Sequence, residues 1–363
     1  PGALFWMWIS AFFGMAVAYM EGVLAQIFKE KKDDEFVGGL PFYGRKFLGN
    51  KVWIGVFLSV LYILYALCCL PAQGFNVVSS VGRMAEIVTG KTIPSGSAFY
   101  YIVGTLIVIL TAAIAFGGIK KVSRWTDMMV PVMAVLYFVI TLFIIFTNLG
   151  SMPGVFKRIF EEAFGFRQAA AGGFGVVLMN GVKRGLFSNE AGSGSAPCAA
   201  AAAECDSPVK AGFVQALGVF VDTIVICSCT AMIMLLAPEN LVQGLSGMEL
   251  LQTAMHYHMG QFGVIFIAAT LFMFSFSTFL GILFYARGNV SYLFGDNWGS
   301  QTGYKVLALV MLFIGGIAAY TFVWDLGDVG IGLMTIFNIF MLYPLGEKAL
   351  KELKIYESEK KKK

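Results

Sequence analysis

Residues 172–204 read GGFGVVLMNGVKRGLFSNEAGSGSAPCAAAAAE, and this segment says most about the type of fold. It is long enough to cross a bilayer, but its middle is polar. Its helix-breaking residues are Gly181, Gly185, Gly192, Gly194 and Pro197. A broken membrane helix is tolerated only where its backbone lines a cavity or is buried in protein. The stretch therefore predicts two half-helices around a binding site, with a re-entrant loop or a simple Gly-rich kink as the alternative.

The residues Ser188-Asn189-Glu190 inside this stretch resemble the start of a helix, with Ser or Asn as the N-terminal cap. The backbone N–H groups of an exposed helix N-terminus attract anions. We therefore expect the second half-helix to present its N-terminus to a bound anionic group.

The composition extends this argument to the whole chain. Of its 363 residues, 58% are hydrophobic and 13% are charged, whereas a soluble domain carries about 25% charged residues. One soluble core could not hide so much apolar surface. The 42 glycines also suit membrane helices, in which small residues allow close backbone packing. The chain is therefore predicted to be an all-α polytopic membrane protein.

Nine segments are apolar over about the 20 residues that a membrane helix needs. They are 4–28, 52–78, 98–118, 127–148, the broken segment 169–204, 208–236, 261–286, 304–324 and 328–345. Two longer links, 149–168 and 237–260, carry apolar residues at helical spacing and are expected to form helices on the membrane surface. The charged tail, 346–363, is expected to be helical and to lie in the cytoplasm.

The basic residues divide unequally between the two sides of these spans. Of the 26 Lys and Arg, 21 fall on the side of the 29–51 link and the tail, when Lys183 and Arg184 are counted there. The positive-inside rule places that side in the cytoplasm. The first span then enters from outside, directly after Pro1. We expect one earlier span to be missing from this chain, since restoring it gives ten spans with both ends inside.

Polar side chains at membrane depth are costly, so each is a candidate site residue. Glu21 lies near the inner end of its span, where a gating or structural role is expected. Asp222 lies about 12 residues, roughly 18 Å, beyond Lys210. It needs a partner, for which Na⁺, a proton and the pair Lys183 and Arg184 are the options.

Lys183 and Arg184 are themselves expensive near the midplane. We expect them to reach the cytoplasmic vestibule or to pair with Glu190 or Glu21. Asp325 and Asp328 are expected at an outer helix end, either solvated or capping the helix.

Ser277 and Thr278 form a second polar group, in the seventh span. Adjacent hydroxyls on a helix can flank one point, and a hard cation such as Na⁺ takes oxygen ligands. The alternative is that these hydroxyls bond back to their own helix.

Several motifs are specific enough to indicate a family. They are PGALFWMWISAFFGM (1–15), the GG-x-x-x-Tyr region (38–43), FGGIKKV (116–122), GVKRGLFSNEAGSGSAP (181–197), FVDTIVICSCTA (220–231), the region 274–280 and VWDLGD (323–328). In this order and along the whole chain, they resemble the alanine/glycine:cation symporter family. That family couples inward movement of Na⁺, occasionally H⁺, to uptake of small neutral amino acids such as alanine and glycine.

The resemblance implies a leucine-transporter-like fold of two inverted five-helix repeats, with the second to tenth helices present. Residues 1–148 would be the remainder of the first repeat and 169–345 the second, within a single transport domain. The implied substrate residues are Gly185, Phe187, Ser188, Asn189 and Gly192, with Gln73 and Asn76 facing them. The implied Na⁺ ligands are Ser277, Thr278 and the Phe274 carbonyl, with Asp222 and Thr223 near a second cation. Glu21, Lys183, Arg184 and Glu190 remain as gating or structural charges.

Two positions depart from the family pattern. Leu40 interrupts the usual Gly-Gly-Pro, and Phe337 stands where Pro usually precedes Asn338. The second change affects a helix near the end of the chain. We expect neither to disturb the coupling sites.

Other functions remain open at this point. A proton-coupled permease of the same fold is the nearest alternative, and a channel could also use a broken helix. An intramembrane enzyme would need paired carboxylates or a Ser/His dyad at depth, whereas His256 and His258 are expected to be solvated. We expect no enzyme activity, no cofactor or metal other than transported sodium, and no nucleic-acid partner. The partners would be Na⁺, a small neutral amino acid and the lipid bilayer.

Overall fold

The computed structural model describes the chain except residues 33–34, 48, 95, 118, 166–172 and 363. Eight of its helices are long and apolar enough to cross a membrane. In chain order they are α1 (Gly2–Phe28), α3 (Val52–Thr89), α4 (Ala98–Ala115), α5 (Ile119–Thr147), the continuous run of α9 (Pro208–Val219), η3 (Phe220–Cys227) and α10 (Ser228–Leu235), α12 (Gly247–Phe294), α13 (Trp298–Ile317) and α14 (Tyr320–Lys362). The polytopic all-α prediction is confirmed.

The remaining predicted span is divided, as its glycines indicated. It consists of α7 (Gly173–Asn189) and α8 (Ser195–Ala202). The first residues predicted for this span, 169–172, lie outside the described part of the chain.

The boundaries of the last two spans differ from the prediction. The link between them lies at residues 318–319, not at 325–327. Ala318 has an extended backbone after Gly315 and Gly316, and these glycines favour a helix end over the uninterrupted apolar run that the sequence presents. Asp325 and Asp328 therefore lie within α14, one to two turns from its start.

Short elements occupy the links. A hairpin of β1 (Glu30–Lys32) and β2 (Glu35–Val37) precedes α2 (Leu40–Phe47), and η1 (Leu149–Ser151) leads into α6 (Met152–Ala163). α11 (Glu239–Val242) precedes α12, which kinks at Gly260 with φ 62°. The links 149–168 and 237–260 thus contain the predicted helices. The charged tail is also helical, because α14 continues to Lys362.

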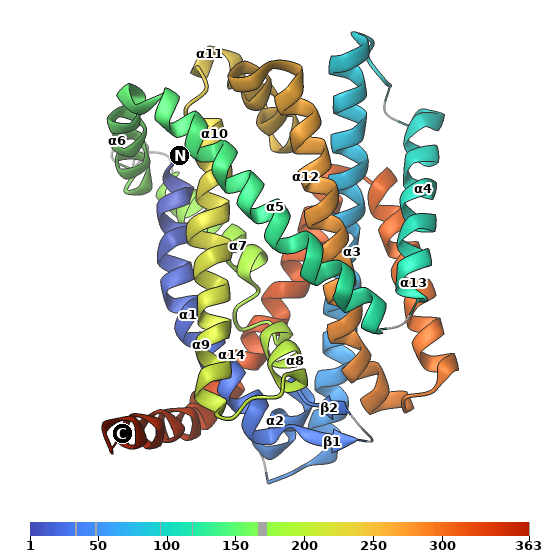
Figure 1. Ribbon diagram of the computed structural model, residues 1–363. Helices are drawn as coiled ribbons and strands as arrows, with labels where there is room; N and C mark the ends of the chain where they lie inside the picture. Colours follow the sequence, from blue (N-terminus) through green and yellow to red (C-terminus); the bar gives the residue numbers. More distant parts are fainter. Residues whose placement is uncertain (33–34, 48, 95, 118, 166–172, 363) are drawn as a thin grey trace.

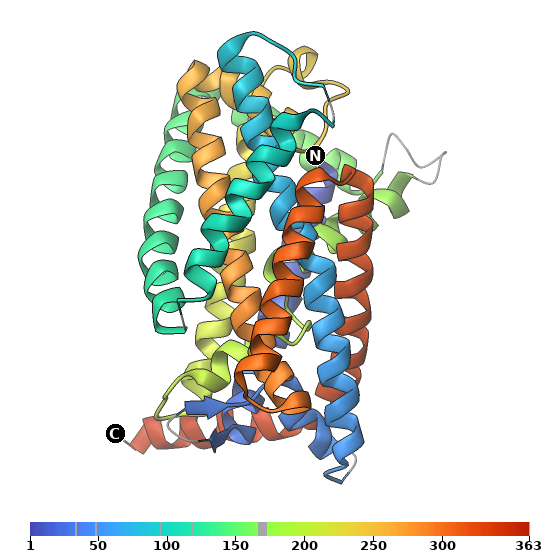
Figure 2. The same ribbon diagram turned by 90° about the vertical axis from the view of Figure 1, so that its right-hand side faces the viewer.

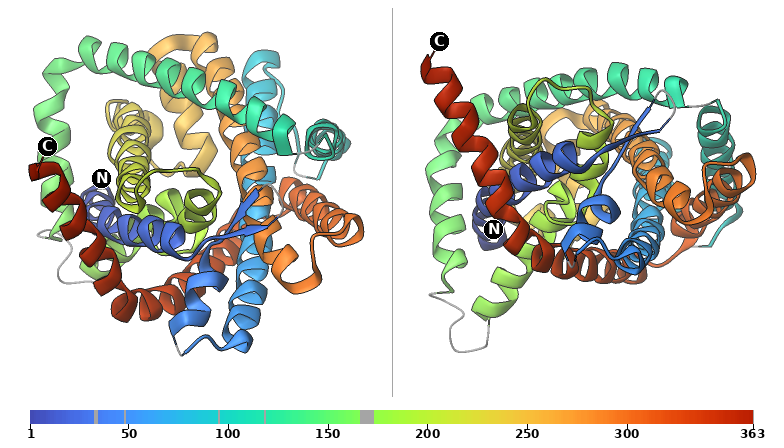
Figure 3. Two further views of the ribbon diagram at one scale, coloured as in Figure 1. Left: turned by 60° about the horizontal axis from the view of Figure 1, so that its bottom comes forward. Right: turned by 90° about the horizontal axis from the view of Figure 1, so that it is seen from below.

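The helices form an elongated bundle (Figures 1 and 2). One end holds α6, α11 and the N-terminus, and we call it the α11 end. The opposite end holds the hairpin, α2 and α8, and we call it the α8 end. Seen from the α8 end, the last part of α14 runs across the bundle and beyond it (Figure 3).

The core is built around α3. It packs against α12, α13 and α14, and Tyr62, Leu58 and Leu70 on it are almost fully buried. Large apolar side chains elsewhere point outward, among them Phe12, Trp53 and Phe340 at more than 60% exposure. A surface of this kind is stable in lipid and not in water.

Candidate functional site

The break between α7 and α8 consists of five residues, 190–194. Its backbone is left-handed at three of them: Glu190 with φ 52°, Gly192 with φ 84° and Gly194 with φ 87°. Glycine adopts such angles without steric penalty, whereas Glu190 must be held there by its surroundings. The sequence thus cannot continue the helix through this point.

Glu21 of α1 binds the broken backbone directly. Its Oε2 accepts a hydrogen bond from the Gly192 amide at 2.9 Å, and its Oε1 accepts one from the Gly194 amide at 3.0 Å. The side chain is completely buried. A carboxylate at the start of a helix satisfies its free N–H groups and its partial positive charge. The predicted cap was wrong, because Ser188 and Asn189 end α7 and the second half-helix begins at Ser195. The place that the sequence suggested for a bound anion is filled by Glu21 itself.

Asn338 of α14 completes this arrangement, which we call the Glu21 cluster (Glu21, Gly192, Gly194 and Asn338). Its Nδ2 donates to Glu21 Oε1 at 2.5 Å and to the Gly192 carbonyl at 2.9 Å, and its Oδ1 accepts from Tyr43 Oη at 2.7 Å. From the sequence, Asn338 was noted only as the residue that follows Phe337, and it was assigned no role. The available signal was a fully polar side chain inside an apolar segment.

Asp222 joins the other side of the break. Its Oδ2 accepts hydrogen bonds from Ser188 Oγ at 2.5 Å and Thr223 Oγ1 at 3.0 Å, and Asn189 Nδ2 donates to Thr223 Oγ1 at 3.0 Å. The helix is widened to a π-helix over Phe220–Cys227, a feature that is frequent at functional sites. The structure thus brings four of the predicted residues together, from α7 and η3.

Lys183 and Arg184 do not follow the prediction. Arg184 hydrogen-bonds to Asp328 Oδ1, and the Lys183 ammonium lies 3.5 Å from Asp328 Oδ2. The Asp328 side chain is only 12% exposed, so it is not the solvated residue that we expected. The reason is geometric: α7 descends from the α11 end, where α14 begins (Figure 1). Lys183 and Arg184 therefore lie on the α11 side of the break, away from the Lys-rich tail.

Phe187, one of the implied substrate residues, belongs to the same group. Its ring centroid lies 4.8 Å from that of Trp324. The Arg184 guanidinium lies 4.7 Å from the centre of the Trp324 ring. Stacking on an aromatic face and bonding to a carboxylate are both well suited to arginine. The Arg184–Asp328 ion pair and the Phe187–Trp324 contact thus join the end of α7 to the start of α14.

Arg184 should contribute more to the stability of the protein than Lys183. Arg184→Gln is expected to destabilise the protein in detergent by about 2 kcal/mol, because it removes a charged hydrogen bond and a stacking contact. Lys183→Gln is expected to change stability by less than about 0.5 kcal/mol, since its ion pair is long and exposed. Denaturant unfolding of both variants provides the measurement. Equal losses would show that charge alone matters at Asp328.

α3 contributes residues that the sequence analysis missed. Tyr62 Oη lies 3.1 Å from Ser195 Oγ, and Tyr65 Oη lies 3.5 Å from Ser193 Oγ. The predicted residues Gln73 and Asn76 lie further along α3, the first buried and the second half-buried. Apolar spans commonly contain tyrosine, so neither ring was distinctive in the sequence.

Two other predicted residues have clear places. A Cβ atom on Gly185 would lie 2.1 Å from Ser10 Oγ, so Gly185 allows α7 to approach α1 closely. Glu190 is half-buried, and its backbone carbonyl accepts hydrogen bonds from the Ser193 hydroxyl at 2.6 Å and the Ser193 amide at 2.9 Å.

The predicted sodium ligands lie on α12. Ser277 is buried and its hydroxyl donates to the Phe274 carbonyl at 3.0 Å, while Thr278 is exposed. The local bond that we named as the alternative is therefore present at Ser277. It uses the hydroxyl proton and leaves oxygen lone pairs for a cation.

His258 also differs from the prediction. It is half-buried, and its Nε2 lies 3.0 Å from the Ile233 carbonyl, whereas His256 is exposed. The kink at Gly260 turns this part of α12 back over α10. Within the described residues, no group of three or more His, Cys, Asp or Glu could hold a metal ion.

Comparison with known proteins gives these features a context. The model of the sodium:alanine symporter family matches residues 1–363. The chain is 36% identical to the amino-acid carrier protein AlsT of Bacillus subtilis, over 99% of this chain and 75% of AlsT. It is 39% identical to the probable sodium/glutamine symporter GlnT of Bacillus subtilis, over 99% of this chain and 73% of GlnT. It is 34% identical to the sodium/alanine symporter AgcS of Methanococcus maripaludis, over 99% of this chain and 78% of AgcS.

These matches run through every element described above, the break included. They identify a membrane transporter and not an enzyme, so the intramembrane-enzyme alternative is excluded. By sequence along its whole length, and in agreement with its helical fold, the chain belongs to the sodium:alanine symporter family.

Proposed function

We propose that the protein carries Na⁺ together with a small neutral amino acid, alanine or glycine, into the cell. The observation that supports this most is the polar helix break between α7 and α8, in a chain that matches a sodium symporter family throughout. Transporters of several folds place substrate and ion at such breaks.

We assign the amino acid to the α7 side of the break. The end of α7 carries a partial negative charge, which suits the substrate ammonium group. Ser188 and Asn189 would contact the amino acid, with Phe187 as the lid. Gly185, Gly192, Gln73 and Asn76 complete the proposed wall. The α8 side is already neutralised by Glu21.

We assign Na⁺ to oxygen ligands on two helices. The first set is the hydroxyls of Ser277 and Thr278 with the Phe274 carbonyl. The second is Asp222 with Thr223, where a carboxylate at membrane depth benefits from a nearby cation. A proton on Asp222 is the alternative, because Ser188 and Thr223, the described side chains that hydrogen-bond to its Oδ2, are uncharged.

The proposal includes a topology. Residues 1–148 and 169–345 would form inverted repeats, and the tail 346–363 would lie in the cytoplasm. The excess of basic residues at the α8 end, where the Lys-rich tail lies, supports this orientation even with Lys183 and Arg184 removed from the count. The membrane would be the cell membrane of a prokaryote.

Sodium dependence tests the proposal. Uptake of labelled alanine into proteoliposomes should be about tenfold faster or more with Na⁺ outside than with K⁺ outside, at zero membrane potential, because ion and substrate stabilise each other's binding. Equal uptake in both would refute sodium coupling. Stimulation by an inward pH gradient in K⁺ would favour the proton alternative. Counterflow of labelled alanine separates a carrier from a channel, which shows none.

A further inference from the structure

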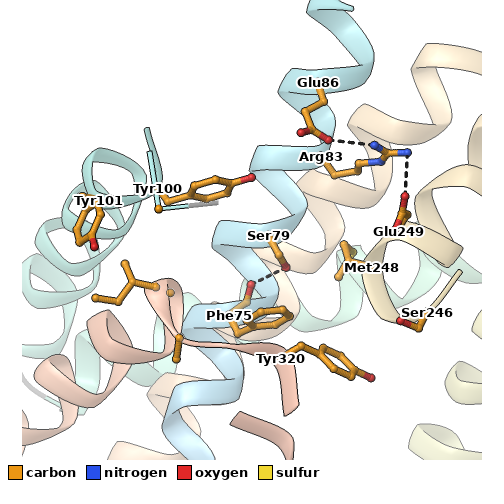
Figure 4. A pocket seen from close by; sticks show the side chains of 14 residues that line it. Phe75, Ser79, Arg83, Glu86, Tyr100, Tyr101, Ser246, Met248, Glu249 and Tyr320 are labelled. Atoms are coloured by element: carbon orange, nitrogen blue, oxygen red, sulfur yellow. Dashed lines mark hydrogen bonds and ion pairs between the residues drawn. The ribbon is translucent and has the colours of Figure 1, made fainter. Parts of the chain in front are cut away.

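A pocket of about 390 Å³ lies at the α11 end of the bundle, away from the break. It is formed by α3, the start of α4, the start of α12 and the link between α13 and α14 (Figure 4). Its principal lining side chains are Phe75, Arg83, Glu86, Tyr100, Glu249 and Tyr320. Pockets of this volume hold small organic molecules.

The charges in the pocket do not cancel. Arg83 is 3.0 Å from Glu86 Oε2, and Glu86 Oε1 also accepts the amide of Ile93 at 2.8 Å. Glu86 and Arg83 therefore neutralise each other. Arg83 contacts Glu249 only at 3.5 Å, and the Glu249 side chain is 52% exposed. Because Arg83 is the single basic residue among the described lining residues, one negative charge is left, and it lies at Glu249.

Aromatic side chains line other parts of the pocket wall. Tyr100 points into the pocket from one side, and Phe75 and Tyr320 lie together below it, with centroids 5.6 Å apart (Figure 4). Two glycines make room for the rings: a Cβ atom would lie 2.6 Å from the Tyr100 ring at Gly82 and 3.0 Å from the Tyr320 ring at Gly247.

We propose that this pocket binds a small organic ammonium cation, with its charge at Glu249 and its carbon atoms against Tyr100 and Tyr320. Aromatic faces beside a carboxylate are the usual environment for such cations. A neutral zwitterion would leave the surplus negative charge unmatched, and a bare alkali cation would make no use of the rings. The proposal rests on the pocket and not on the transport function.

An occupant of the pocket would contact Tyr320, which is the first of three neighbouring rings that lead to Phe187. Tyr320 lies 6.1 Å from Trp324, and Trp324 lies 4.8 Å from Phe187, measured between ring centroids. A bound cation would thus touch one end of a row of three rings that are in contact with one another.

Calorimetric titration of the purified protein in detergent tests the site with choline. The uncharged compound 3,3-dimethylbutan-1-ol has nearly the same shape and is the comparison ligand. We expect choline to bind about tenfold more tightly or better, since a cation over aromatic rings beside a carboxylate gains about 1.4 kcal/mol or more. Equal affinities would overturn the proposal.

Two glutamates on neighbouring segments provide matched variants. Glu249→Gln should weaken choline binding about tenfold. Glu239→Gln should leave it unchanged, because Glu239 is exposed and lies 3.6 Å from Arg158, outside the pocket. An unchanged affinity in Glu249→Gln would assign choline to another place.

Saturating alanine with Na⁺ distinguishes this pocket from the break. We expect it to leave choline binding unchanged. Displacement of choline would mean that choline occupies the transport site, and the proposal would fail. Since no transport is measured, the outcome is independent of sodium coupling. For the same reason, K⁺ and not choline should replace Na⁺ in uptake experiments.

Discussion

Replacing Glu21 with glutamine is expected to abolish alanine uptake and to lower the free energy of unfolding by about 3 kcal/mol. Three donors point at the two carboxylate oxygens: the amides of Gly192 and Gly194 and the Asn338 side chain. Glutamine offers one acceptor oxygen and turns an NH₂ group toward a donor. At least one buried N–H then loses its partner, and the broken backbone loses its negative cap.

Glu347→Gln is the matched control, because Glu347 is an exposed glutamate on α14. It should keep wild-type unfolding and uptake. Asn338→Ala provides a milder change, since it leaves the carboxylate bound to both amides. It should retain folding while reducing uptake. If Glu21→Gln unfolds and transports like the wild type, the cluster does not hold the break.

Replacing Ser277 and Thr278 together with alanine should raise the Na⁺ concentration for half-maximal uptake about tenfold or more, since oxygen ligands are lost from a weak cation site. The maximal rate of uptake at saturating Na⁺ should change less, because neither hydroxyl is assigned to the amino acid. Proteoliposome uptake over a Na⁺ series is the measurement.

Thr270→Val is the control on the same helix. Thr270 is buried and donates to its own backbone, at the Phe266 carbonyl, as Ser277 does at Phe274. Its loss should leave the Na⁺ dependence unchanged. If the double variant keeps the wild-type Na⁺ dependence, other oxygens bind the ion. The single variants then show whether buried Ser277 or exposed Thr278 contributes more.

The sequence predicted the helices well because the physical signal is local. An apolar run of about 20 residues marks a membrane helix by itself. The break was also local, since Gly192 and Gly194 lie within one stretch and glycine discourages helix. The end of α13 was harder to place, because the run continues apolar through Ala318 and the break depends on packing against α3.

The partners across the break were not predictable in the same way. Glu21 and Gly192 are separated by 171 positions, and Glu21 and Asn338 by 317. Hydrophobic spacing shows which residues share a helix, but not which helices meet or at what height. Arg184 was therefore assigned to the wrong end of the bundle, and its partner Asp328 was taken for a solvated residue.

The Glu21 cluster also constrains the order in which its hydrogen bonds can form during biosynthesis. A chain is made from its N-terminus, so α1 is synthesised long before the partners of its carboxylate exist. Glu21 must remain uncompensated, or protonated, until residues 192–194 have been made, and its last partner, Asn338, is synthesised 317 residues after it. Helix α1 thus cannot reach its final environment until α14, which carries Asn338, has been synthesised.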